Sequence, residues 1–178
     1  VLYVGDLDRS LAFYTGILDF DVVNEIPGGA FLRAAASTND HDLALFALGA
    51  DARRSTAGRG GTVGLYHLAW EVDTLGELVE VAERLRDANA LVGASDHGTT
   101  KSLYAHDPDG LELEVVWLIP ATQLTADDLA ARTSVGHLDL AAEIERFGLD
   151  EVGGVGISSP EIAPTLRNQP PQPTPKAT

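Results

Sequence analysis

The sequence contains no cysteine, which excludes disulfide bridges and thiolate-ligated zinc or iron–sulfur sites. Any transition metal must therefore be held by histidine and carboxylate side chains. Long apolar runs are also absent, since no stretch reaches the roughly eighteen residues that a membrane-spanning helix needs. The first residues do not show the charged and then apolar pattern of a signal peptide. We therefore expect a cytoplasmic protein that does not bind membranes.

Basic residues are scarce. The chain has 12 lysine and arginine residues against 27 aspartate and glutamate residues, which gives a net charge of −15. Repulsion opposes the binding of such a chain to nucleic acid phosphates or to an anionic membrane surface, so we expect neither as a partner. With 178 residues and 44% hydrophobic content, the chain is long enough for one well-filled core.

The order of the expected elements repeats along the chain. The first half predicts a strand at 1–4, a helix after the N-cap Asp6, and strands at 21–25, 30–35 and 42–48. The second half predicts a strand at 63–72, a helix at about 75–88, and strands near 90–94, 102–105 and 111–117. Between them, residues 49–61 are rich in glycine, alanine and arginine and are typical of a linker. A unit of this size written twice predicts an α+β fold with two sheets able to enclose a cleft.

The C-terminal part has a different character. Thr125 is a predicted cap for a short helix through Ala131, and residues 137–147 form a better amphipathic segment that His137 is expected to begin. From residue 148 onward glycine, serine and proline dominate, so residues 148–178 are predicted to be disordered and without a catalytic role. Near the other end, Arg9 falls opposite the apolar face of the first helix and is expected in solvent.

His67 and Glu114 are the candidate metal ligands. His67 stands among apolar residues of an expected strand, where a histidine taken alone is more often a core residue than a ligand. Strand geometry places Glu112 and Glu114 together on the face opposite Leu111, Leu113, Val115 and Trp117. An exposed outer face would explain both carboxylates without a function. On a concave inner face Glu114 would point toward His67, and a cation such as Fe(II), Mn(II), Ni(II) or Zn(II) would offset the cost of burying it.

Three stretches carry a resemblance to a known superfamily. Residues 4–20, 66–72 and 107–114 resemble the opening helix and two metal-binding strands of the vicinal oxygen chelate superfamily. This superfamily includes glyoxalase I, the fosfomycin and bleomycin resistance proteins, and the extradiol ring-cleavage dioxygenases. The resemblance implies paired βαβββ modules in a half-open barrel, with modules at about 1–49 and 62–119 of a domain at 1–120. A helical extension at 121–147 would follow this domain.

The residues between the two candidate ligands are similar to those of the catechol 2,3-dioxygenase type. The resemblance implies that His67 and Glu114 are metal ligands. It also implies that His97 is the acid/base residue that serves the oxygen chemistry, and that Tyr104 donates a hydrogen bond to the substrate oxygen. Both latter roles suit the side chains, because histidine exchanges a proton near neutral pH and a phenol stabilises oxyanion charge. Taken singly, a turn histidine and a half-buried strand tyrosine are the alternatives.

One family residue is missing from this sequence. The first metal ligand of the family is a histidine two residues ahead of the position that Val1 occupies, so we expect the natural chain to extend upstream. Ala44 stands where glyoxalase I would have a metal-binding carboxylate, and this leaves open metal positions that suit a catecholate and dioxygen.

The sequence therefore predicts an extradiol dioxygenase of aromatic compound catabolism. It would use non-haem Fe(II), or else Mn(II), to insert O2 into a small catechol-like aromatic diol, and we expect a homodimer or higher homo-oligomer. Two alternatives stay open at this point: a metal-free, drug-binding resistance protein, and a glyoxalase-like isomerase or transferase.

Overall fold

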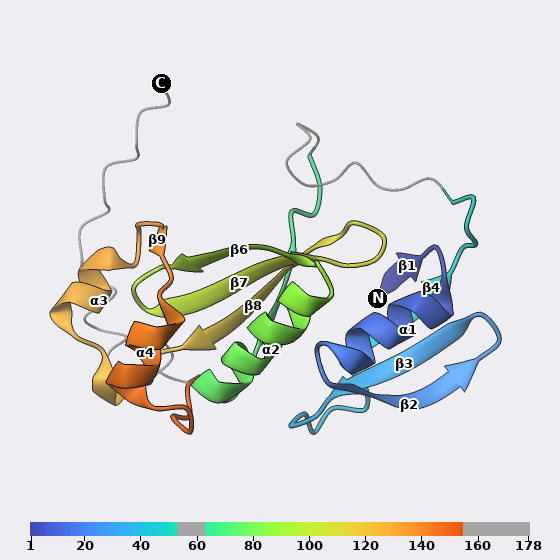
Figure 1. The fold of residues 1–178 in the computed structure, drawn as a ribbon. Helices are drawn as coiled ribbons and strands as arrows, with labels where there is room; N and C mark the ends of the chain where they lie inside the picture. The colour runs from blue at the N-terminus through green and yellow to red at the C-terminus, as the bar shows by residue number, and fades with distance from the viewer. Residues whose placement is uncertain (53–62, 155–178) are drawn as a thin grey trace. The chain divides into compact units, whose positions relative to one another are not determined.

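The structure, a computed structural model, describes residues 1–52 and 63–154. Its elements are β1 (Leu2–Val4), α1 (Leu7–Gly16), β2 (Phe20–Ile26), β3 (Gly29–Ala34), β4 (Leu43–Ala47), β5 (Leu68–Glu71), α2 (Leu75–Asp87), β6 (Leu91–Asp96), β7 (Thr100–His106), β8 (Glu112–Leu118), η1 (Ala121–Gln123), α3 (Ala126–Ala131), β9 (Gly136–His137) and α4 (Leu140–Phe147). The order βαβββ thus occurs twice before the C-terminal helices (Figure 1). This confirms the predicted α+β class and its paired repeats.

The first repeat is a four-stranded sheet with one helix. The strand order is β1-β4-β3-β2, in which β1 runs parallel to β4 and the other pairs are antiparallel. Helix α1 begins where predicted, since the Asp6 carboxylate accepts a hydrogen bond of 3.0 Å from the Arg9 backbone N–H. The helix buries Phe13 and Tyr14, and the central strands bury Leu32 and Leu45. These side chains form the core of the repeat.

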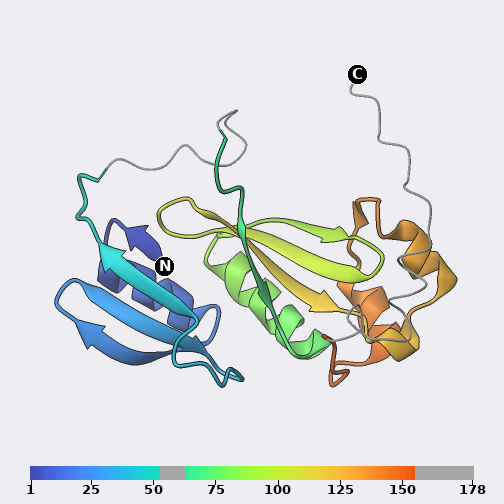
Figure 2. The same cartoon turned by 180° about the vertical axis from the view of Figure 1, so that it is seen from behind.

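The second repeat contributes four strands of a five-stranded sheet of order β5-β8-β7-β6-β9, which is seen from behind in Figure 2. Helix α2 buries the predicted stripe that includes Leu78 and Leu85. Along β8 the buried residues are Leu113, Val115 and Trp117, so the predicted apolar face is confirmed. Strand β5 is shorter than expected.

In the described residues, the C-terminal segment adds strand β9 to this sheet and also contains η1 and the two α-helices α3 and α4. Thr125 caps α3 through a capping box with Asp128, as the sequence predicts. Strand β9 pairs antiparallel with β6. His137 lies in β9, so the expectation that it begins a helix is wrong. Asp139 caps α4 instead, because its carboxylate accepts hydrogen bonds from the Ala141 and Ala142 backbone N–H groups.

Residues after α4 run back to the N-terminal end of α2. The Gly76 N–H donates to the Leu149 carbonyl at 2.8 Å, and the Gly153 N–H donates to the Asp73 carbonyl at 2.8 Å. Residues 155–178 of the predicted disordered tail, and residues 53–61 of the predicted linker, lie outside the described residues. In the part of the chain that the structure describes, no helix has the length and apolar character needed to cross a bilayer.

The chain divides into two compact units that each draw on several segments. The first consists of Val1–Ala69, Glu80–Val92 and Tyr104–Glu114, and the second of Trp70–Val79, Gly93–Leu103 and Val115–Thr178. His67, Tyr104 and Glu114 belong to the first unit, and His97 belongs to the second.

Candidate active site

The structure brings His67 and Glu114 together. His67 lies immediately before β5, Glu114 lies in β8, and these two strands are neighbours in the sheet. The Nε2 atom of His67 is 3.0 Å from Oε2 of Glu114, and the side chains are 24% and 15% exposed. Glu114 stands on the face of β8 opposite the buried Leu113, because alternate side chains of a strand point to opposite faces. The pair is therefore half-buried and in direct contact.

This pair fits two neighbouring positions of a metal site. His67 Nε2 and Glu114 Oε2 lie 3.0 Å apart, which is close enough for both atoms to bind one ion. Imidazole nitrogen and carboxylate oxygen together suit divalent first-row metals. Nδ1 of His67 is buried with no hydrogen-bond partner among the described residues. Within that part of the chain no group of three or more histidine, aspartate or glutamate residues is placed to hold a metal ion.

Tyr104 contacts the carboxylate of the same pair. Its phenol hydroxyl donates a hydrogen bond of 3.0 Å to Oε1 of Glu114. Its ring stands edge-to-face toward His67, with 6.1 Å between the ring centroids. The two oxygens of Glu114 therefore face different partners, Oε1 the phenol and Oε2 the imidazole. Three of the four predicted site residues thus lie together.

His97 follows the last residue of β6 and belongs to the second compact unit. Its Nδ1 lies 3.1 Å from the backbone carbonyl oxygen of Ser134, in the segment between α3 and β9. A carbonyl oxygen only accepts hydrogen bonds, so this contact requires the proton to be on Nδ1. That His97 acts on the same substrate as the other three residues stays a prediction.

The turn that leads into β8 is fixed by two aspartates. The carboxylate of Asp107 is buried and accepts hydrogen bonds from the Asp109 and Leu111 backbone N–H groups at 2.9 and 2.8 Å. It also accepts one from the Tyr14 hydroxyl at 3.2 Å. Burial raises the pKa of Asp107 above its usual value, and burial together with the Asp107 charge raises the pKa of Tyr14. The turn thereby sets the start of the strand that carries Glu114.

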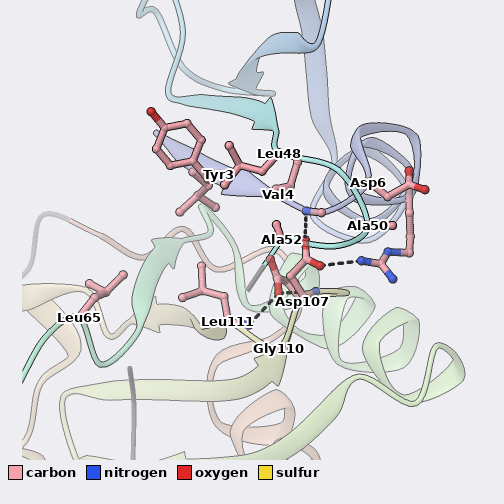
Figure 3. A pocket seen from close by; sticks show the side chains of 14 residues that line it. Tyr3, Val4, Asp6, Leu48, Ala50, Ala52, Leu65, Asp107, Gly110 and Leu111 are labelled. Atoms are coloured by element: carbon pink, nitrogen blue, oxygen red, sulfur yellow. Dashed lines mark hydrogen bonds and ion pairs between the residues drawn. The ribbon is translucent and has the colours of Figure 1, made fainter. Parts of the chain in front are cut away.

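Asp109 joins this turn to β1 and α1. Its carboxylate accepts a hydrogen bond of 2.8 Å from the Gly5 backbone N–H and one of 2.6 Å from the Arg9 guanidinium (Figure 3). Arg9 is exposed, as expected, with its side chain 46% accessible, and its guanidinium also pairs with this carboxylate. The helical pattern shows which side of α1 is polar, but it carries no information about a carboxylate 100 residues further along the chain.

A cavity of about 510 Å³ opens beside this turn. Tyr3, Leu48, Leu65 and Leu111 form much of its apolar wall (Figure 3), and Arg9 is also among the residues that line it. None of the four predicted site residues lines this cavity. It is therefore distinct from the His67–Glu114 pair, which the chemistry of the side chains marks as the candidate site.

The sequence of this chain is similar to those of known dioxygenases. The chain is 36% identical over 118 residues to a biphenyl-2,3-diol 1,2-dioxygenase of Rhodococcus globerulus and 30% identical over 114 residues to a catechol-2,3-dioxygenase of Bacillus subtilis. These matches cover 65% and 64% of this chain but only 59% and 38% of the two dioxygenases. The chain thus spans about half the length of these curated relatives.

Other relatives have a different named activity. A lactoylglutathione lyase of Neisseria meningitidis is 31% identical over 123 residues, which are 65% of this chain and 86% of the lyase. The solved structure of a lactoylglutathione lyase from Agrobacterium tumefaciens aligns at 26% identity and a TM-score of 0.47, over 65% of this chain and 87% of that one. Residues 1–115 match the model of the Glyoxalase/Bleomycin resistance protein/Dioxygenase superfamily, and the chain therefore belongs to that superfamily.

Proposed function

We propose that this protein is an extradiol ring-cleavage dioxygenase whose site includes His67, Glu114, Tyr104 and His97. The observation that carries the proposal is the contact of His67 Nε2 and Glu114 Oε2 at 3.0 Å, with the Tyr104 hydroxyl on the other carboxylate oxygen. An imidazole and a carboxylate on neighbouring strands supply two of the three ligands of a facial triad. The two dioxygenase relatives favour a catechol-like diol as the substrate, and the resemblance to the catechol 2,3-dioxygenase type implies Fe(II) as the metal.

Each of the four side chains would have its own role in this reaction. His67 and Glu114 hold the metal, and Tyr104 orients the Glu114 carboxylate by donating to Oε1. Fe(II) held by these two residues would supply a Lewis-acidic centre with open positions that a diol could chelate through both of its oxygens and where dioxygen could be activated. His97 exchanges protons with the reacting oxygens, a task for which imidazole is suited near neutral pH.

The residue at position 44 supports this proposal over a glyoxalase-like isomerase. Ala44 is a buried methyl group in β4, where the resemblance places a metal-binding carboxylate in glyoxalase I. The first repeat therefore offers no ligand from this strand position. A site with fewer protein ligands keeps metal positions open for a chelating diol.

Iron binding and ring cleavage test the proposal directly. The protein, with whatever residues precede Val1 in the natural chain, is loaded with Fe(II) and given catechol and O2, and a yellow ring-cleavage product and one iron per chain are expected. Glu114→Ala should lose iron, whereas Glu112→Ala, two residues away on the same face of β8, should retain it. Iron-free protein without turnover would leave the superfamily assignment standing and remove the dioxygenase.

The acid/base assignment needs a separate variant. His97→Phe should keep iron and lower turnover by about 100-fold or more, as expected for removal of a general acid–base residue. His106→Phe is the matched control, because His106 is half-exposed at the end of β7 and has no proposed role. Full ring cleavage by His97→Phe would show that another group moves the protons.

A further inference from the structure

The turn between β6 and β7 is enclosed by the C-terminal extension, which we define as residues 121–147. This extension lies beyond the residues that match the superfamily model, which end at 115. Strand β9 pairs with the end of β6 and places His137 opposite Ser95 and Gly136 opposite Asp96. The turn residues 97–99 follow directly, so the sheet pairing brings the extension to the base of the turn. All of these residues belong to the second compact unit.

Helix α3 contacts the same turn through Gly98. This glycine has a φ of +75°, and a Cβ at this position would overlap the backbone of Asp128 and Arg132. A residue without a side chain thus allows the backbone of α3 to lie directly against the turn. The Gly98 N–H donates a hydrogen bond of 2.7 Å to Oδ1 of Asp96, which holds the turn itself.

A buried lysine joins the turn to α4. The Lys101 side chain is 1% exposed, and its Nζ lies 2.8 Å from Oδ1 of Asp96 and 3.2 Å from Oε1 of Glu143. A buried ammonium group is stable only when carboxylates or other acceptors surround it, so loss of one partner is costly. Arg146 of α4 further binds Asp128 of α3 through two hydrogen bonds of 2.8 and 2.6 Å. The two helices and the turn are therefore linked by charge pairs.

The contact that these links hold in place is the hydrogen bond from His97 Nδ1 to the Ser134 carbonyl, at 3.1 Å. Resting on the proposed function, we infer that the C-terminal extension positions His97 by holding its Nδ1–H on the Ser134 carbonyl, so that Nε2 exchanges protons in the reaction. When Nε2 takes up a proton, Nδ1 keeps its own proton and the hydrogen bond remains. When Nε2 releases the proton, the ring returns to the same tautomer without turning.

The tautomer of His97 is the direct test and needs neither turnover nor a disruptive variant. Two-bond ¹H–¹⁵N NMR spectra of the histidine rings are recorded on the metal-free full chain, and the His97 signals are assigned by their loss in His97→Phe. We expect the neutral ring to carry its proton on Nδ1. A neutral ring protonated on Nε2 would overturn the inference. Because this experiment requires no activity, its outcome is independent of whether the protein cleaves catechol.

A second experiment tests whether the C-terminal extension determines the tautomer and the position of His97. Glu143→Ala removes one partner of Lys101, and Glu145→Ala alters an exposed glutamate of the same helix as the matched control. In Glu143→Ala we expect the Nδ1–H preference to weaken and kcat to fall about ten- to 100-fold, with KM within about twofold, because a small displacement of an acid/base group slows the chemical step. Glu143→Gln, which keeps an acceptor oxygen, should restore part of both signals.

Loss of the fold is separated from loss of positioning by a third measurement. The buried Trp117 ring packs against Phe147 of α4, with 5.2 Å between the ring centroids, so its fluorescence reports whether α4 stays docked. A Glu143→Ala protein with the fluorescence of the unaltered chain and the changed His97 tautomer supports the inference. Docked α4 with an unchanged tautomer and unchanged kcat would refute it.

Discussion

Tyr104 donates its phenol hydrogen to Oε1 of Glu114 at 3.0 Å, and this leaves Oε2 of the same carboxylate in contact with His67. The tyrosine therefore contacts a proposed metal ligand rather than only the space where a substrate would bind. A partner of this kind sets the orientation of a ligating carboxylate and tunes its affinity for the metal.

Replacing Tyr104 with phenylalanine tests this relationship. Tyr104→Phe should weaken metal binding by about ten- to 100-fold, because the Glu114 carboxylate loses the donor that orients it. Metal affinity is measured by competition with a chelator. Tyr3→Phe is the control, since Tyr3 is 72% exposed. Unchanged metal affinity with a raised KM for catechol would instead assign the phenol to the substrate.

The contacts of Asp109 predict that replacing Asp109 destabilises the fold more than replacing its partner Arg9. Asp109→Ala should lower the free energy of unfolding by about 2 kcal/mol, because the Gly5 N–H and the Arg9 guanidinium both lose their acceptor. Arg9→Ala should cost at most about 1 kcal/mol, since its side chain is 46% exposed and solvent screens the pair. Urea unfolding of the single and double variants measures both values. Equal losses in the two single variants would contradict the bond to Gly5.

Asp128 predicts a dependence of stability on pH. Burial disfavours its charged form, but the hydrogen bonds from Arg146 and Thr125 outweigh this and place the pKa of Asp128 below its ordinary value of 3.8. A carboxylate whose pKa is lower in the folded state stabilises the fold above its unfolded pKa and loses that contribution as the pH falls through the folded pKa.

The matched comparison uses neighbouring aspartates of α3. Asp128→Asn should cost about 2 kcal/mol of unfolding free energy near neutral pH, and the cost should shrink as the pH falls below about 4. Asp127→Asn alters an exposed side chain and should show little effect at either pH. Urea unfolding at several pH values checks this, and a cost that grows on acidification would have the wrong sign.

Two adjacent valines test which face of β8 is the core. Val115 is 1% exposed, whereas Val116 is on the Glu114 face and only partly buried. Val115→Ala should lower the free energy of unfolding by about 2 kcal/mol, because a fully buried side chain loses its contacts, and Val116→Ala by less than about 1 kcal/mol. Equal losses measured by chemical denaturation would mean that both faces are packed alike.

Local patterns were sufficient to predict most of the elements and the face of Glu114, although not strand β9 or the start of α4. The alternation in β8, the cap at Asp6 and the cap at Thr125 depend only on residues a few positions apart, and the structure confirms all three. The proximity of His67 and Glu114 was also predicted, but only because the repeat pattern placed their strands in one sheet.

Contacts between distant segments were not predictable in this way. The acceptor of His97 is a backbone carbonyl 37 residues later, which no side-chain pattern reveals. The sequence also carried no signal that Lys101 is buried, because its partner Glu143 lies 42 residues later in a helix whose docking no local pattern predicts. Both misses concern the C-terminal extension, whose position depends on tertiary packing.

Strand β9 has one more consequence. By pairing with Ser95 and Asp96, it satisfies main-chain donors and acceptors at the edge of β6. Left unpaired, this edge could form hydrogen bonds with strands of other molecules. A chain shortened after residue 120 would expose this edge, and we expect such a fragment to self-associate and precipitate during purification.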